Sequence, residues 1–497
     1  MRVVSAGVAA FYLYLDAQPS AETSRHLRAL HLALTPSPSQ VRDIIIGYTS
    51  LLIEHDPAAK QTELIDWALE RAETEPDTPP AKHHEIPVAY GLEADVDDLS
   101  KRLGLSWDEI VSLHSGATYT VAFNGFTHGF PYLLGLPKAL HLPRRETPRK
   151  HIAAGSVAIA VGQGGIYPVD SPGGWWVLGK TDFKLWDASR DVPTTLEPGD
   201  SVSFVPVDTI GEIVQPSSAL EQEGALEVTQ VWPKNVSLQG TAQWGLGRYS
   251  APQGGVLDPL AAEFANTIIG NPRDAAVLEM LAQPITLKLR EALTVCVTGG
   301  GLKLFIDTKE AVCWEAYKLE RGALLELIPD KSVTGYTSYL AADGGFMLDK
   351  RFAPTYMEAG QTIALANLGA SSPRPYRGRP HYPQRIRLRI HPGPQYNEEA
   401  FEKLLGSSFR VQVLNRMGVR LTGPPIILPD HDTPSEGSPW GAVQVPASGQ
   451  PIILLSDRGR TGGYAKPAVC DVSDLWRLAQ AGPGTEVWFV RAFEDVG

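Results

Sequence analysis

The sequence predicts a mainly β protein with smaller α+β parts. Short apolar segments punctuated by Gly and Pro fill residues 118–208 and most of the chain after residue 229. The 47 Gly and 40 Pro among 497 residues fit a chain rich in turns. Residues 1–80 instead alternate strand-like and helix-like segments. A chain of this length divides into roughly three or four units of ~100–200 residues.

Residues 1–80 predict a small α+β domain. Strands are expected in "VAAFYLYL" and "SLLIEHD", and helices in "SAETSRHLRALHLAL" and "AKQTELIDWALERAET". In the second helix, Leu64, Ile65, Ala68 and Leu69 fall on one face. The apolar N-terminal run imitates a signal peptide, but its alternating aromatic residues favour a strand.

Residues 81–213 predict a β-barrel or sandwich domain. The Pro-rich stretch "TEPDTPPAKHH" marks its beginning, and a helical passage with Ser106 as N-cap precedes the strand-rich part. Gly and Pro then punctuate short apolar segments from Thr118 to Asp208. The polar segment 214–228 is low in aromatic residues and predicts a linker to the second half.

Residues 229–497 again predict mostly short strands and turns. One clear helix lies in "LDPLAAEFANTIIGNP", where Asp258 can cap the helix, Pro259 suits its first position and Gly270 ends it. The stretch "RIRLRI" alternates charged and apolar residues with period two. This pattern favours a half-exposed strand, and an anion-binding patch is the alternative.

Composition narrows the possible partners. Lys and Arg number 44 against 56 Asp and Glu, so the net charge is −12. This charge repels nucleic acids and anionic membranes. No apolar run reaches the ~20 residues of a membrane span, and we expect a cytoplasmic protein. The three cysteines form no C-x-x-C pair, so we expect small buried side chains and no metal site.

The first of four candidate clusters is "FNGFTHGFPYLLGLPKALHLPRRETPRK". His128 lies between two glycines, and a histidine on such a loop can titrate near neutrality and act as acid or base. A hydrogen-bonded loop histidine is the alternative. Arg144 and Arg149 can clamp a carboxylate or phosphate, with ordinary surface arginines as the alternative.

The second cluster lies in residues 153–187 and is rich in glycine. Gln163, Tyr167 and Trp175 lie among these glycines, which indicates a backbone packed closely against a ligand or a neighbouring strand. The stretch "GGWWVLGKTD" matches the spacing of a phosphate-binding P-loop. Its bulky residues between the glycines favour a strand instead.

The third and fourth clusters lie in the second half. Gln243, Arg248 and Asp258 approach the N-terminus of the predicted helix, where an anion can bind. The fourth cluster spans residues 415–468 and contains Arg416, Arg420, Glu436, Gln444, Asp457, Arg460, Tyr464 and Lys466. No Ser-His-Asp order, H-E-x-x-H or G-x-S-x-G occurs that would mark a familiar hydrolase.

These clusters carry a family resemblance over nearly the whole chain. The first half resembles KipI, or allophanate hydrolase subunit 1, in "EIPVAYG", "GFTHGFPYLLGLP", "PRRETPR" and "LEPGDSVSFVPV". The second half resembles KipA, or allophanate hydrolase subunit 2, in "GGVLDPLAAEFANTIIGN", "NRMGVRLTG" and "GQPIILLSDRGRTGGYAK". The resemblance implies a cyclophilin-like β-barrel after the small α+β domain, and two related barrel lobes in residues 229–497.

The resemblance also implies a choice of functions. Members pair with a LamB/YcsF-type subunit in an ATP-dependent 5-oxoprolinase, which opens a small lactam to glutamate with ATP and Mg²⁺. Others form the carboxyltransferase region of biotin-dependent urea carboxylase, and a KipI protein is described as an inhibitor of a histidine kinase. We favour the oxoprolinase component because the sequence contains no biotin carrier and no ATP-grasp carboxylase.

Roles follow for the candidate residues under this resemblance. His128 and Asp258 are expected to transfer protons. Arg248 and Lys466 are expected to stabilise the negative charge that develops during the reaction, together with Arg144, Arg149 and Arg416. The expected substrate-binding residues are Phe130, Arg144, Arg149, Gln163, Tyr167, Trp175, Gln243, Arg416, Gln444 and Tyr464. Two positions depart from the family pattern: His128 replaces a usual Pro, and Trp244 stands where an acid is usual.

Overall fold

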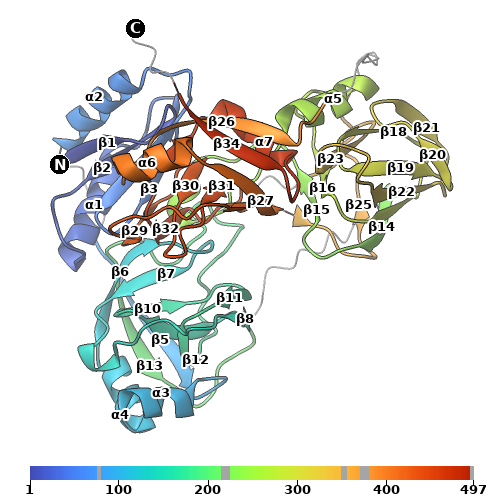
Figure 1. Ribbon diagram of the computed structural model, residues 1–497. Coiled ribbons are helices and arrows are strands. Elements are labelled where there is room, and N and C mark those ends of the chain that lie inside the picture. The colour runs from blue at the N-terminus through green and yellow to red at the C-terminus, as the bar shows by residue number, and fades with distance from the viewer. Residues whose placement is uncertain (75–79, 214–223, 349–354, 370–379, 493–497) are drawn as a thin grey trace.

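The computed structural model describes residues 1–74, 80–213, 224–348, 355–369 and 380–492. Its strands form two closed barrels, a four-stranded sheet, a pair of six-stranded sheets and two short two-stranded arms. This confirms the prediction of a mainly β chain with β-barrels and a small α+β domain. Figure 1 shows the N-terminal domain beside the C-terminal barrel, with the first barrel below them and the paired sheets to the right.

The sheet of the N-terminal domain is covered on both faces. Two helices of the same domain pack on one face, and the C-terminal barrel packs on the other. The sheet has the order β1-β2-β4-β3, formed by Arg2–Ser5, Ala10–Tyr14, Ser50–His55 and Val41–Ile46. Helices α1 (Ala21–Ala33) and α2 (Gln61–Ala72) share a core with Phe11 and Leu13. On the opposite face, Tyr12 and Leu52 pack against Val469 of the C-terminal barrel. Successive side chains of β2 therefore point alternately to the domain's own helices and to the C-terminal barrel, so this strand contacts both halves of the chain.

The first barrel follows, in the order β10-β7-β6-β13-β5-β12-β9. The capping box of Ser106 with Glu109 begins α4 (Trp107–Ser115), as its sequence predicts, and α3 (Val96–Leu103) precedes it. The barrel strands are His83–Tyr90 (β5), Thr118–Asn124 (β6), Pro131–Leu134 (β7), Ser156–Ala160 (β9), Gln163–Ile166 (β10), Trp176–Lys180 (β12) and Ser201–Pro206 (β13). A two-stranded arm of β8 (Arg149–Ile152) and β11 (Ser171–Gly173) extends from it.

The P-loop spacing has no phosphate-binding geometry. Residues of "GGWWVLGKTD" form β12, and no helix begins after Thr181. Lys180 is buried and pairs with Glu93 at 2.6 Å. The strand expected from its bulky residues is confirmed.

Two six-stranded sheets enclose the core of the first lobe in the second half. Their orders are β20-β19-β22-β17-β14-β25 and β21-β18-β23-β16-β15-β24. The strands are Leu226–Val231 (β14), Val236–Gln239 (β15), Val277–Leu281 (β16), Ile285–Leu289 (β17), Leu293–Gly299 (β18), Leu302–Ile306 (β19), Lys309–Ala311 (β20), Ala316–Leu319 (β21), Leu324–Pro329 (β22), Thr337–Ala342 (β23), Thr355–Tyr356 (β24) and Thr362–Ile363 (β25). Helix α5 (Pro259–Ile269) packs on β18 and β23 and begins at Asp258 as expected.

Two predicted boundaries lie partly outside the described residues. Positions 75–79 of the Pro-rich stretch and positions 214–223 of the linker are not described. Strand β14 begins at Leu226, within the predicted linker, because Leu226 and Val228 are buried in the core of the first lobe.

The C-terminal barrel repeats the topology of the first barrel. Its order is β26-β33-β30-β31-β28-β27-β34, and in both barrels the first and last strands along the chain pair in parallel. The strands are Arg385–Pro392 (β26), Ser408–Asn415 (β27), Gly418–Thr422 (β28), Ala442–Gln444 (β30), Ile452–Leu454 (β31), Ala468–Cys470 (β33) and Glu486–Arg491 (β34), with helices Glu398–Leu405 (α6) and Leu475–Ala479 (α7). Its arm of β29 (Asp432–Gly437) and β32 (Thr461–Tyr464) occupies the same chain positions as the β8–β11 arm. Strand β26 alternates exposed and buried residues, as predicted.

Candidate active site

One segment of the C-terminal barrel, residues 457–466, contacts every other part of the fold. Arg458 binds Gln253, which lies shortly before α5 of the first lobe, and Glu54 of the N-terminal sheet. The hydroxyl of Thr461 accepts a hydrogen bond from the backbone N–H of Phe126 in the first barrel at 3.4 Å. We therefore treat the surroundings of this segment as the candidate active site and call them the junction.

A buried network of charges lies at the centre of the junction. Arg458 Nη2 lies 2.6 Å from Glu54 Oε1, and Arg460 Nη2 lies 2.5 Å from Asp43 Oδ2 and 3.0 Å from Glu54 Oε2. The Gln253 side-chain oxygen accepts hydrogen bonds from both guanidinium groups. The N-terminal domain thus supplies the carboxylates and the C-terminal barrel supplies the cations.

The acidic partners carry opposite pKa shifts. Burial raises the pKa of Asp43, although Arg460 opposes this. Burial also acts to raise the pKa of Glu54, but the two arginines outweigh it and hold this pKa below its usual range. Sequence reasoning missed Asp43, Glu54 and Arg458. The available signal was an acid inside each of the apolar strands "VRDIII" and "SLLIEH", because a buried charge requires a partner.

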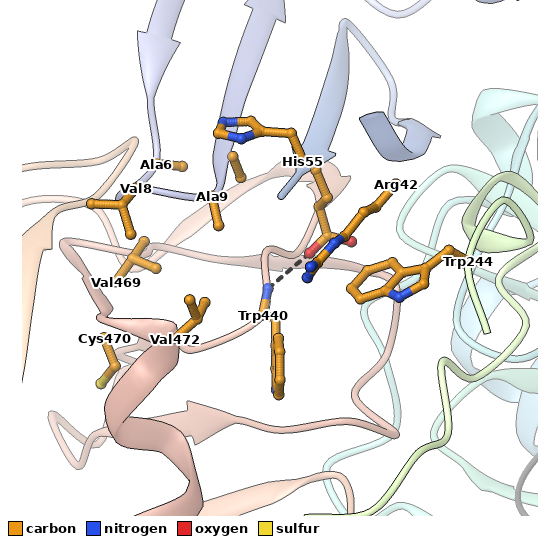
Figure 2. A pocket seen from close by; sticks show the side chains of 12 residues that line it. Ala6, Val8, Ala9, Arg42, His55, Trp244, Trp440, Val469, Cys470 and Val472 are labelled. Atoms are coloured by element: carbon orange, nitrogen blue, oxygen red, sulfur yellow. Dashed lines mark hydrogen bonds between the residues drawn. The ribbon is translucent and has the colours of Figure 1, made fainter. Parts of the chain in front are cut away.

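A small cavity of about 20 Å³ adjoins this network, between the N-terminal sheet and the C-terminal barrel. In Figure 2 the rings of Trp244 and Trp440 stand on one side of it, and the dashed line joins the Trp440 backbone N–H to Glu54. Arg42 stacks over Trp244 at 5.2 Å. The cavity holds about one water molecule, so it is too small for a substrate.

The loop between β6 and β7 crosses the junction and brings two predicted residues together. The Gly129 N–H donates to the Tyr249 carbonyl at 2.9 Å, and the His128 ring lies 4.9 Å from Trp186. The Arg248 guanidinium stacks over the Tyr249 ring at 4.4 Å. Because Trp186 and Tyr249 share one apolar cluster, His128 and Arg248 lie on the same side of the junction.

The expectation that His128 titrates near neutrality is wrong. Burial lowers the pKa of His128 to about 4, because the imidazolium loses its hydration beside Trp186. At neutral pH the ring is uncharged, so it can accept a proton but holds none to donate as an imidazolium.

Gly125 allows the loop to approach Thr461, which leads to a prediction. A β-carbon at this position would lie 2.5 Å from Thr461 Oγ1 and 2.6 Å from the Tyr132 ring. We expect Gly125→Ala to destabilise the protein by about 1–3 kcal/mol through overpacking, measured by urea denaturation. Gly164→Ala in the same barrel is the control, since its nearest neighbours would be 3.6 Å away. Equal stability of the two variants would contradict the close approach.

Three further predicted residues form one aromatic cluster in the first barrel. The Phe130 ring meets Tyr167 edge-on at 5.1 Å and Trp175 at 5.5 Å. All three are buried. Tyr132 and Tyr48 extend the cluster toward the C-terminal barrel, where the Tyr48 N–H donates to the Ser435 carbonyl at 3.0 Å. Gln163 begins β10 and is half-buried.

Other predicted residues are held in structural contacts. Arg416 is buried and binds Asp457 with two hydrogen bonds, Glu279, and the Gly255 carbonyl. The Asp258 side chain caps α5 at Ala261 N and accepts from Gln480 at 2.9 Å. These contacts tie the first lobe to the C-terminal barrel.

Lys466 is fully buried, and its ammonium lies 2.9 Å from Glu436 Oε1. Tyr14 of the N-terminal domain donates to the other oxygen of Glu436 at 2.7 Å. Arg149 pairs with Asp95. Three further candidates differ in exposure: Gln243 is half-buried, Gln444 is buried in β30 beside Gly462, and Tyr464 is 38% exposed.

The described ranges contain neither a candidate metal-binding cluster nor a candidate membrane-spanning helix. No group of three or more His, Cys, Asp or Glu side chains there is placed to hold a metal ion. Among these residues no helix is long and apolar enough to cross a membrane.

Comparison with known proteins identifies the family. The carboxyltransferase domain, subdomains C and D, matches residues 1–196, and subdomains A and B match residues 249–491. A 5-oxoprolinase subunit of Escherichia coli O157:H7 is 39% identical over 204 residues, which cover 40% of this chain and 93% of that protein. The chain belongs to this carboxyltransferase-domain family.

Other members match the second half and the whole fold. A different 5-oxoprolinase subunit, from Haemophilus influenzae, is 28% identical over 277 residues, covering 51% of this chain and 87% of that protein. The urea amidolyase of Lachancea kluyveri is 25% identical over 54% of this chain and 16% of its own length. The crystal structure of TTHA0988, 34% identical, superposes with a TM-score of 0.84 and covers 97% of this chain and 99% of its own.

Proposed function

We propose that the chain is a component of an ATP-dependent 5-oxoprolinase that opens the lactam of 5-oxoproline to glutamate together with a LamB/YcsF-like subunit. The observation that carries this proposal is a pair of similarities within one chain. The chain matches 93% of one 5-oxoprolinase subunit and 87% of a second, different one. The KipI-like and KipA-like halves would therefore supply in one chain what those relatives divide between two polypeptides.

The junction supports hydrolysis of an amide. The neutral imidazole of His128 can take a proton from an attacking water. Arg248 makes no ion pair within the part of the chain that the structure describes, so its charge is available to an anionic group. ATP, when bound, would phosphorylate the lactam oxygen, so that water adds to the activated carbon and the C–N bond breaks with the ring nitrogen leaving as the amine. A second water would then release phosphate from the resulting acyl phosphate and leave glutamate. A half-buried guanidinium stacked on Tyr249 fits the negative charge that this chemistry brings.

A carboxyltransferase component acting with biotin on urea or a related amide is the second candidate. The names of the matching domains and the similarity to urea amidolyase favour it. In that reaction the same groups would hold a carboxylate and deprotonate an amine. A regulator of a histidine kinase, the third function implied by the resemblance, would need none of this chemistry.

Phosphate release tests the proposal. The purified chain is assayed with and without the LamB/YcsF-like subunit and with and without 5-oxoproline. We expect ATP turnover that depends on 5-oxoproline in the complete mixture, and at least a tenfold loss of kcat for Arg248→Met. Arg273→Met is the control, because its side chain is 71% exposed and pairs with Glu263 in the first lobe. No turnover dependent on 5-oxoproline would contradict the proposal.

A further inference from the structure

Arg144 is the uncommitted cation of the "PRRETPR" motif. Its neighbours are neutralised, since Arg145 lies 3.2 Å from Asp95 and Arg149 pairs with the same carboxylate. Arg145 also stacks over Trp176 at 4.6 Å. Arg144 is exposed, and it makes no ion pair with any residue that the structure describes. Its guanidinium is therefore available to a ligand.

The Arg144 side chain begins beside Gly174, the residue before Trp175, whose ring contacts Phe130 and Tyr132. Three tyrosines of this region feel its charge. The rings of Tyr48 and Tyr132 are 6.3 Å apart, and Phe130 contacts both Tyr132 and Tyr167. Burial raises the pKa of Tyr132 to about 12, and the charge of Arg144 acts in the opposite direction. Arg144 acts in the same way on the pKa values of Tyr48 and Tyr167, which burial also raises. One guanidinium thus lies within electrostatic reach of three phenol groups.

The hydroxyl of Tyr48 is the most informative of the three. Tyr48 is 4% exposed, and its hydroxyl makes no hydrogen bond with any described residue. Its position is fixed, because its backbone N–H donates to Ser435 and its ring meets Phe123 edge-on at 4.8 Å. A buried hydroxyl without a partner is costly. This cost is removed if a ligand accepts its hydrogen bond.

We propose that Arg144 and the hydroxyls of Tyr48, Tyr132 and Tyr167 form a subsite for the carboxylate of a small organic acid. These groups can all donate hydrogen bonds, as an anion requires. A single cation beside aromatic rings suits one carboxylate on a small ring better than a polyphosphate. The inference rests on the proposed function, in which the ligand is the carboxylate of 5-oxoproline. Urea is neutral and has no carboxylate for this subsite to bind.

Three parts of the fold meet at this subsite. Tyr48 comes from the β3–β4 turn, Tyr132 and Tyr167 come from the first barrel, and Ser435 of the C-terminal barrel holds the Tyr48 backbone. Tyr132 also lies against Gly125, at the contact with Thr461. A bound carboxylate would thus be next to the junction.

Calorimetric titration of the full chain, alone and with the LamB/YcsF-like subunit, tests the subsite. The probes are 5-oxoproline, 2-pyrrolidinone, which has the same ring without the carboxylate, and ATP. We expect 2-pyrrolidinone to bind at least tenfold more weakly than 5-oxoproline. Tyr48→Phe and Arg144→Gln should each weaken 5-oxoproline at least tenfold and leave ATP unchanged. Tyr317→Phe is the control, since its hydroxyl bonds to Val312 in the first lobe.

The outcomes separate the subsite from the proposed function. If 5-oxoproline does not bind, or binds Tyr48→Phe and Arg144→Gln as it binds the wild type, the subsite is overturned even when ATP turnover is present. If the variants lose ATP binding instead, the site takes phosphate and the inference is wrong. If the variants lose 5-oxoproline binding while the wild type shows no turnover, the subsite stands and the proposed function fails. Melting temperatures near that of the wild type show that the variants are folded.

Discussion

Replacing Arg460 with alanine is expected to lower the free energy of unfolding by about 3–5 kcal/mol. The Arg460 side chain is 1% exposed, and its guanidinium lies between the carboxylates of Asp43 and Glu54. Its removal leaves Asp43 buried without its ion pair, and Glu54 keeps only Arg458. Because these acids belong to the N-terminal sheet, we expect that sheet to separate from the C-terminal barrel. Urea denaturation followed by circular dichroism measures the loss.

The matched control is Arg385→Ala in the same barrel. Arg385 also forms an ion pair, with Glu486, but its side chain is 68% exposed and water replaces the lost partner. We expect its unfolding midpoint to stay close to that of the wild type. Similar midpoints for the two variants would mean that the buried network does not hold the halves together.

Local elements of the fold could be predicted because their signals lie within a few residues. Ser106 and Asp258 begin helices by capping N–H groups three residues later, and Gly270 ends a helix in a left-handed conformation. The alternation in residues 385–390 appears as alternate burial in β26. These features depend on backbone geometry next to each residue, so the sequence was sufficient.

The junction could not be predicted in the same way, because its contacts are distant along the chain. Arg458 and Glu54 are separated by 404 positions, and Arg460 and Asp43 by 417. No periodic pattern links such pairs. The resemblance indicated that these segments matter, without indicating which of them meet.

The cationic candidate residues fall into two groups, those paired with a buried carboxylate and those without a carboxylate partner among the described residues. Arg416 and Lys466 were chosen as cations for a substrate, yet both are buried against carboxylates. Arg144 and Arg248 look no different in sequence, but within the described ranges neither has a carboxylate partner. The positions of acids from other domains decide this difference, and one sequence does not give them.

The protein is expected to lose stability steeply as the pH falls below about 6.5. Burial lowers the pKa values of His31 and His114 to about 3 each, and that of His128 to about 4. Between about pH 6.5 and 4, each of the three histidines binds a proton in the unfolded chain and not in the folded one. The free energy of unfolding therefore falls by about 1.4 kcal/mol per pH unit for each, or about 6 kcal/mol for the three at pH 5. Urea denaturation at pH 7, 6 and 5 measures this slope.

The slope is a better readout than stability at pH 7, because replacing a buried histidine also removes packing. The His114 ring stacks on Phe204 at 4.6 Å, and Nδ1 lies 2.7 Å from the Tyr90 hydroxyl. His114→Gln should be less stable at pH 7 and yet lose about a third of this histidine-dependent slope between pH 6.5 and 5. His151→Gln, with a side chain that is 65% exposed, should retain the wild-type slope. If His114→Gln keeps the full slope, protonation of this buried ring does not drive the acid instability.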